Sequence, residues 1–386
     1  MDPALTISFV SSIAAIPSAQ WNRLAGDDSP FLRHEFLLAL ETSGCTTARS
    51  GWQPRHGVIK NRDGVIVALL PLYEKDNSFG EYVFDWSWAD AYRTHGLAYY
   101  PKLVTAVPFT PSTGARLLTA GDQQNGLLIK AVVDGVQGLA AGMSASSWHV
   151  LFPGEAESQA LKDAGLMQRR GCQFHWFNRG YRDFDGFLGA LNSRRRKNVR
   201  KERAVVDQQG IGFDVIEGPD VTPEQWERFY HFYQNTYRVR GRQGYLNLEF
   251  FLAIGQSMPD NLTLILAHAG RQPIAGALFF KSKTRLFGRY WGSLDDYRFL
   301  HFETCFYRAI DYAIQQGMAV FDAGAQGEHK IQRGFEPVPT WSNHWIAHPA
   351  FGDAIAEFLE REALYIQRYM DEAATLLPFR QESESN

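Results

Sequence analysis

Cysteine and long apolar runs are scarce in this chain. Its 386 residues include three cysteines, Cys45, Cys172 and Cys305, and no two of them stand in a CxxC spacing. We therefore expect neither a disulfide framework nor a structural zinc site. The cysteine content instead favours a reducing, cytoplasmic location. Because no run of about 18 apolar residues occurs, we also expect no membrane span.

The net charge is small, and several well-known catalytic motifs are absent. The formal charge is −3, so no global field favours nucleic acid or membrane, and any anion site must be local. The sequence contains no HExxH pattern, no Walker loop and no serine nucleophile elbow. We therefore expect no catalytic metal and no tightly bound cofactor. Apolar residues make up 45% of the chain, enough for a core in each of two domains.

Four short patterns occur twice in the same order, at separations of roughly 200 residues. A chance likeness between generic helix and strand patterns is one explanation, but the constant order favours a tandem duplication with domains at 1–178 and 179–386. The paired segments are 20–23 with 225–228, 34–40 with 248–254, 58–73 with 264–281, and Trp86-x-x-x-Asp90-x-Tyr92-Arg93 with Trp291-x-x-x-Asp295-x-Tyr297-Arg298.

Hydrophobic periodicity predicts the same order of elements in both copies. The first copy should contain a strand at 7–10, two helices within 18–41, and three successive strands at 57–60, 65–73 and 82–88. A helix, a strand, a helix and a final strand follow between 125 and 178. This order is that of a GNAT fold. We therefore expect an α/β (α+β) chain of two tandem GNAT-like domains, each a mixed, mostly antiparallel sheet flanked by helices.

The segment from Phe321 to Phe335 has the densest set of reactive side chains. It follows a predicted buried strand, where α/β folds usually place their sites. Amide formation needs a base for the attacking amine and a cation for the oxyanion. A polar surface loop whose charges pair with one another is the alternative. The candidate catalytic residues are Glu328, His329, Lys330 and Arg333, with Asp322 and Gln326 as substrate contacts.

The duplicated Trp-Asp-Tyr-Arg element is a second candidate. Aromatic rings beside an Asp and an Arg suit a substrate groove. The alternative is a structural Asp–Arg pair that pins the turn into the next helix. The candidate substrate-binding residues are Trp86, Asp90, Tyr92 and Arg93 in the first copy, and Trp291, Asp295, Tyr297, Arg298 and His301 in the second.

A basic run lies near the start of the second copy. Seven of the ten residues at 194–203 are Lys or Arg. We expect a helix that packs through Val199 and Val206 and presents a dense cationic face. A solvated surface is one interpretation of that face. The other is a site for the phosphates of a nucleotide, a tRNA end or an acidic lipid, formed by Arg196, Lys197 and Arg200.

Three of these features together resemble the FemAB-like group of predicted N-acyltransferases. They are the basic run at 193–201, the strand end Tyr290-Trp291-Gly292-Ser293, and the closing Asp322-x-Gly324-Ala325-x-Gly327-Glu328-His329-Lys330-x-x-Arg333-Gly334-Phe335. The group lies in the GNAT superfamily and is related to the Fem peptidyltransferases of peptidoglycan cross-bridge synthesis. The resemblance covers nearly the full chain and implies two GNAT-like domains with a cleft beside the second.

The resemblance also implies an activity. Fem enzymes pass an aminoacyl group from tRNA to an amine of a cell-wall precursor, assisted by a lysine near the last loop. Lys330 is the best match for that lysine, with Arg333 as its rival. The chain has neither the long helical arm of better-known Fem proteins nor a clean acyl-CoA pyrophosphate loop.

We therefore expect a cytoplasmic N-acyltransferase that acts on a small-molecule or peptide amine. Its acyl donor would be aminoacyl-tRNA, or alternatively acyl-CoA. A non-catalytic module that binds peptidoglycan or tRNA is the interpretation outside enzymes.

Overall fold

The computed structural model describes residues 5–120, 126–325 and 327–380. The chain divides into two units, Met1–Cys172 with Pro339–Arg368, and Gln173–Val338 with Tyr369–Asn386. The sequence placed one boundary at 178/179, whereas the units of the structure divide inside a strand and assign a late segment to the first unit. Gln326, a predicted substrate contact, lies outside the described residues.

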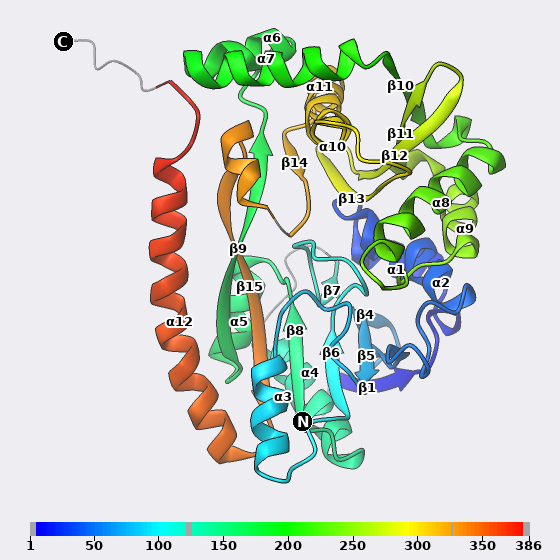
Figure 1. Cartoon of the computed structure of the whole chain (residues 1–386). Coiled ribbons are helices and arrows are strands. Elements are labelled where there is room, and N and C mark those ends of the chain that lie inside the picture. The colour runs from blue at the N-terminus through cyan, green and yellow to red at the C-terminus, as the bar shows by residue number, and fades with distance from the viewer. Residues whose placement is uncertain (1–4, 121–125, 326, 381–386) are drawn as a thin grey trace. The chain divides into compact units, whose positions relative to one another are not determined.

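Unit 2 is built on a sheet whose strand order is that of a GNAT fold (Figure 1). Four strands run antiparallel to their neighbours, namely β10 (Ile211–Glu217), β11 (Leu262–Ala269), β12 (Gln272–Lys281) and β13 (Arg285–Ser293). The short β14 (Val320–Asp322) then lies parallel to β13, and the end of β9 (Met167–Phe177) lies antiparallel to β14.

Helices pack against this sheet. Two of them pack next to each other, α8 (Pro223–Arg238) and α9 (Leu248–Ser257), and α8 approaches β13 so closely that a Cβ at Gly292 would lie 1.9 Å from the Phe232 carbonyl oxygen. The remaining elements are α6 (Phe184–Ala190), α7 (Ser193–Gln208), α10 (Leu300–Phe302), the π-helix η5 (Glu303–Tyr307), α11 (Arg308–Gln315), and the 3₁₀ helices η3 (Gly218–Asp220), η4 (Pro259–Asn261) and η6 (Glu328–Arg333).

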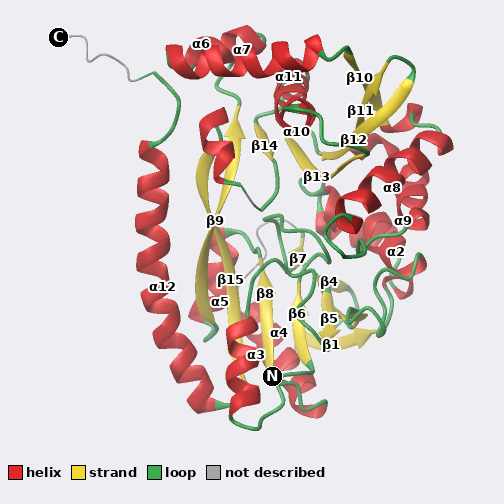
Figure 2. Cartoon of the chain, in the orientation of Figure 1, coloured by secondary structure: helices red, strands yellow, loops and turns green. Residues whose placement is uncertain are grey.

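Unit 1 repeats the strand order with one break (Figure 2). β1 (Leu5–Val10), β3 (His56–Asn61) and β4 (Ile66–Leu70) are antiparallel, and β7 (Leu118–Thr119) pairs with β4. Immediately after β4, β5 (Leu72–Lys75) pairs with β2 (Gln53–Pro54) and with β6 (Lys102–Thr105), and β8 (Ser147–Leu151) lies parallel to β6. The helices are η1 (Ile13–Ala15), α1 (Ser18–Ala25), η2 (Pro30–Leu32), α2 (His34–Thr42), α3 (Trp86–Thr94), α4 (Gly126–Gly142) and α5 (Glu155–Asp163).

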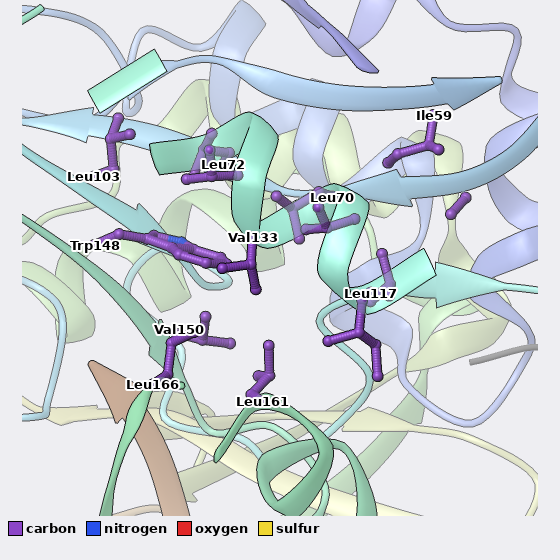
Figure 3. Packing of buried hydrophobic residues seen from close by; sticks show 14 of the residues in the cluster. Ile59, Leu70, Leu72, Leu103, Leu117, Val133, Trp148, Val150, Leu161 and Leu166 are labelled. Atoms are coloured by element: carbon purple, nitrogen blue, oxygen red, sulfur yellow. The ribbon is translucent and has the colours of Figure 1, made fainter. Parts of the chain in front are cut away.

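The apolar core of unit 1 packs α4 and α5 against the sheet. Figure 3 shows Leu70, Val133 and Trp148 converging from β4, α4 and β8. All three are at most 5% exposed, and burial of such side chains is the main favourable term in folding, at about 1.5–3 kcal/mol for each.

The last strand of each unit comes from a distant part of the chain. β15 (Glu336–Ile346) pairs antiparallel with β8 through Ser342–Ile346, and this pairing places residues 339–368 in unit 1. The long helix α12 (Pro349–Thr375) follows β15. In the described part of the chain, no helix has both the length and the apolar character needed to cross a membrane.

The duplication is visible at three of the four paired segments. α1 and α2 correspond to α8 and α9, and the hairpin β3–β4 corresponds to β11–β12. The fourth pair fails, because residues 86–94 form α3 and the strand expected at 82–88 is wrong. Trp88 and Tyr92, four residues apart, are both buried against Tyr99, so this segment follows a helical period rather than an alternating one.

Candidate active site in unit 2

A cavity opens in unit 2 where β13 and β14 part. The two strands pair over only three residues each, ending at Phe287 and Asp322. β13 then continues along β12, while the chain after Asp322 turns away at Gly324, whose φ of 87° favours glycine. The cavity measures about 290 Å³ and is lined by Arg240, Ala277, Leu278, Phe279, Gly288, Arg289, Tyr290, Trp291, His301, Cys305, Phe306, Ala323, His329 and Lys330.

Lys330 lies on the wall of this cavity and is only 2% exposed. Its Nζ donates a hydrogen bond of 2.6 Å to the Gly324 carbonyl oxygen, and no carboxylate among the described residues lies within ion-pair distance of it. Burial lowers the pKa of Lys330 to about 8, with the Arg289 charge lowering it further and Asp322 opposing the change. The side chain therefore exchanges its proton near neutral pH.

A buried ion pair links β13 to β14 at the point where their backbone pairing ends. Arg289 on β13 donates to both carboxylate oxygens of Asp322 on β14, at 3.1 and 2.6 Å. The Gly324 N–H also donates to Asp322, at 2.9 Å. Although burial raises the pKa of Asp322, Arg289 and His175 bring it well below its usual range. Asp322, predicted as a substrate contact, is thus engaged by Arg289, a residue that the sequence did not single out.

Two histidines face the cavity. The pKa of His329 is lowered by burial and by the charges of Arg333 and Lys330, so its ring is neutral at pH 7 and able to accept a proton. Burial, then His329, lowers the pKa of His301 to about 4. The centroids of the His301 and His329 rings lie 6.2 Å apart, and the centroids of the His301 and Trp291 rings lie 5.4 Å apart. The structure therefore brings together four predicted site residues, Trp291, His301, His329 and Lys330.

Arg333 points away from the lining of the cavity. Its guanidinium donates to Tyr307 Oη at 2.9 Å, to the His329 carbonyl at 2.9 Å and to the Glu202 carboxylate at 2.8 Å. It also lies 3.5 Å from the ring centroid of Phe302. These contacts fasten η6 to α7 and to the π-helix, which gives Arg333 a positioning role for the turn that carries His329 and Lys330.

Glu328 is exposed and accepts a hydrogen bond of 3.0 Å from Tyr369 Oη. Like Arg333, it is absent from the lining of the cavity. Two of the four residues predicted as catalytic thus line the cavity, and the other two hold the turn by contacts elsewhere in unit 2.

The remaining predicted substrate contacts lie outside the cavity lining. In unit 2, Asp295 is exposed, Tyr297 packs against the cluster around Val206, and Arg298 lies over the Phe299 ring. In unit 1, Trp86 is 43% exposed, Tyr92 is buried, and Asp90 and Arg93 form an exposed ion pair of 2.5 Å one turn apart on α3. In the first copy the Asp and the Arg therefore pair with each other on the surface of one helix, away from any turn between a strand and a helix.

The basic run forms α7, with Val199 and Val206 buried as expected. Arg200 pairs with Asp185 at 3.1 Å, and Arg196 Nη2 lies 3.5 Å from Ser193 Oγ. Lys197 is exposed. The sequence did not single out Glu202, which joins α7 to Arg333 and to the Tyr307 hydroxyl.

The apolar core of unit 1 contains a much smaller cavity. β6 and β8 are parallel, and the apolar cavity beside β8 measures about 10 Å³, room for about one water molecule. Arg116 fills the neighbouring interior, with its side chain donating to the carbonyls of Leu151 and Ser112. Among these two spaces, only the cavity of unit 2 has the size of a substrate site.

Comparison with known proteins gives a family and a fold. The FemAB_like family model, described as peptidoglycan biosynthesis/recognition, matches residues 12–381. FemX has a similar structure, with a TM-score of 0.52 and 14% identity over 82% of this chain and 93% of FemX.

Two further solved structures are similar. The C-terminal domain (DUF2156) of a putative lysylphosphatidylglycerol synthetase from Agrobacterium fabrum has a TM-score of 0.54 and 12% identity, over 88% of this chain and 96% of that domain. L-PGS from Bacillus licheniformis has a TM-score of 0.50 and 11% identity, over 87% of this chain and 98% of L-PGS. No curated protein matches the sequence at a significant level. The family and the fold together support a transferase activity.

Proposed function

This chain belongs to the FemAB_like family, and we propose that its second unit is an N-acyltransferase that joins an amine to an activated acyl group. The observation that carries the proposal is the pairing of a neutral histidine and a buried ammonium on one cavity wall. His329 and Lys330 are consecutive, and both line the space where β13 and β14 part. Acyl transfer to an amine requires these two kinds of group.

The reaction follows from their positions. The amine nitrogen attacks the acyl carbonyl carbon, a C–N bond forms, and His329 takes the proton that the nitrogen loses. Lys330 donates to the oxyanion of the tetrahedral intermediate. When the bond to the leaving oxygen or sulfur breaks, His329 returns the proton to the leaving group. The rings of Tyr290, Trp291 and Phe306 supply the apolar part of the lining.

Two donors fit this chemistry, an aminoacyl ester of tRNA and an acyl thioester of coenzyme A. The cationic face of α7 supports the tRNA ester, because Lys197, Lys201 and Arg194 are exposed on it and phosphate contacts from such residues dominate nucleic-acid affinity. The same helix is bonded to η6 through Glu202 and Arg333. The acceptor is a small-molecule or peptide amine, for which a peptidoglycan precursor is the candidate that the family description suggests.

A transfer assay with radiolabelled aminoacyl-tRNA and with radiolabelled acyl-CoA, each with a panel of amines, tests the proposal. We expect His329→Gln and Lys330→Met each to lower the rate by about 100-fold or more. The matched control is Asp90→Asn on α3, which should keep the wild-type rate.

Each outcome decides between the candidate functions. If turnover occurs and both cavity variants retain it, the site is wrong. If neither donor reacts although a ligand binds, the chain is the non-catalytic module that the sequence left as an alternative. The donor that reacts identifies the substrate class.

A further inference from the structure

The cavity of unit 2 has positively charged side chains on its wall and no acidic ones. Among the residues that line it, Arg240, Arg289 and Lys330 carry a positive charge, and no Asp or Glu is present. Asp322 neutralises Arg289 from behind the wall through two hydrogen bonds. No described carboxylate lies within 4 Å of Arg240 or Lys330. Two cations without a carboxylate partner, the buried Lys330 and the exposed Arg240, therefore line one space of about 290 Å³.

Lys330 is the more unusual of the two. An ammonium group has three N–H donors, and the structure uses one, toward the Gly324 carbonyl. At 2% exposure, the group has lost most of its water without gaining a counter-ion. Burying a charge in this way is unfavourable unless the charge is paired. The unused donors of Lys330 are available to the oxyanion that forms during transfer, and Arg240 is the cation of the wall that remains for a permanent anion of the ligand.

The rest of the wall restricts the body of such a ligand. The rings of Phe279, Tyr290, Trp291 and Phe306 are apolar surfaces, and about 290 Å³ lies at the small end of the range for ligand pockets. A compact apolar or aromatic body with one anionic group fits both the size and the lining.

We propose that this cavity binds a substrate that carries its own carboxylate or phosphate, and that it discriminates against a free ammonium. The inference deepens the proposed function and rests on it, in that the ligand is taken to be one of the two substrates. Arg240 holds the permanent anion, which leaves Lys330 to face the carbonyl oxygen during transfer. The same positive field favours the deprotonated form of an amine that enters the cavity, which is the form that attacks.

The test is direct binding of four probes that share one apolar body, measured by calorimetry at pH 7 without donor or acceptor. The probes are 3-phenylpropionate, 2-phenylethyl phosphate, 3-phenylpropanol and 3-phenylpropylamine. We expect at least one of the two anions to bind about 10-fold or more tightly than the alcohol, and the amine to bind most weakly. Salt at about 0.5 M should narrow the difference.

Two arginines provide matched variants. Arg240→Gln should remove most of the preference for the anion. Arg242→Gln should leave it unchanged, because Arg242 is exposed, as Arg240 is, but does not line the cavity. The stronger of the two anions identifies the ligand group as a carboxylate or a phosphate, and either result supports the proposal.

Three results overturn the proposal. They are binding of the amine as tight as that of the anions, an undiminished anion preference in Arg240→Gln, and no binding of any probe at millimolar concentration. The outcome is independent of turnover. Anion preference without transfer contradicts only the proposed function, and transfer without anion preference contradicts only this inference.

Discussion

Lys330→Met is expected to make the protein more stable at neutral pH. A pKa lowered from 10.5 to about 8 corresponds to about 3 kcal/mol of unfavourable charge in the folded state. Methionine has a similar length and carries no charge, so it removes that penalty and loses the bond to Gly324, worth about 1 kcal/mol. The variant should therefore gain about 2 kcal/mol of unfolding free energy at pH 7.

The sign of this effect depends on pH in a defined way. Below pH 8 the lysine is charged in both states, and the full penalty is present in the wild type. Between pH 8 and 10.5 the folded state loses its proton first, so the wild-type free energy of unfolding rises relative to that of the variant. Above 10.5 the penalty is gone, and the variant should be less stable by about the energy of the lost hydrogen bond.

Guanidinium unfolding of both proteins at pH 7, 9 and 10.5 measures the difference. Lys281→Met is the control of opposite sign, because hydrogen bonds to Glu217 and Tyr312 outweigh burial and raise the pKa of Lys281. That variant should lose stability at pH 7. The reasoning is refuted if Lys330→Met is less stable than the wild type at pH 7, or if its difference from the wild type does not change with pH.

The other predictions concern the remaining groups of the site. Arg333→Met should lower the free energy of unfolding by about 3 kcal/mol, because it leaves the Glu202 carboxylate without its guanidinium; a Glu202→Met, Arg333→Met double variant should recover much of the loss, and full additivity would contradict the pairing. Asp90→Ala should change stability by less than about 0.5 kcal/mol in thermal unfolding, because its ion pair with Arg93 is exposed, and a larger loss would show a structural role that the contacts do not include. The rate of transfer in the wild type should fall above about pH 8 as Lys330 loses its proton, and the acidic limb should lie below pH 6.5 because the pKa of His329 is lowered; a rate–pH profile that still rises at pH 9 would remove the ammonium from the mechanism.

Much of the fold followed from local patterns in the sequence. The helix pairs α1–α2 and α8–α9 and the hairpin that follows each pair have strong periodicity at matched positions, so the duplication and the GNAT-like order could be predicted. The segment at 82–88 was misassigned because Trp86 and Trp88 alternate like strand residues. The helix is set by Trp88 and Tyr92, whose burial depends on Ile355 and Leu359 far along the chain.

The exchange of strands at the unit boundary had no local signal. β15 pairs with β8 across nearly 200 positions of sequence, and pairings of that kind depend on tertiary contacts. The division at 178/179 was therefore drawn from repeat spacing alone and could not place residues 339–368.

The candidate site was located but not resolved by sequence. The cluster at 328–333 pointed to the turn that supplies His329 and Lys330 to the cavity lining, yet spacing could not separate Lys330 from Arg333. The separation depends on Glu202 and Tyr307, which take up the guanidinium. Arg289 went unnoticed because a lone arginine in a strand has no motif. Its partner Asp322 lies 33 residues further along the chain, and nothing local in the sequence brings the two strands together.

The central claim is that acyl transfer takes place in the cavity between β13 and β14, and a side chain that fills this cavity tests it most directly. Ala277 on β12 lines the cavity and is 2% exposed. In Ala277→Phe we predict that transfer falls by about 100-fold or more, while the melting temperature stays within about 5 °C of the wild type because the ring enters existing space. A folded Ala277→Phe variant that transfers at the wild-type rate would contradict the account.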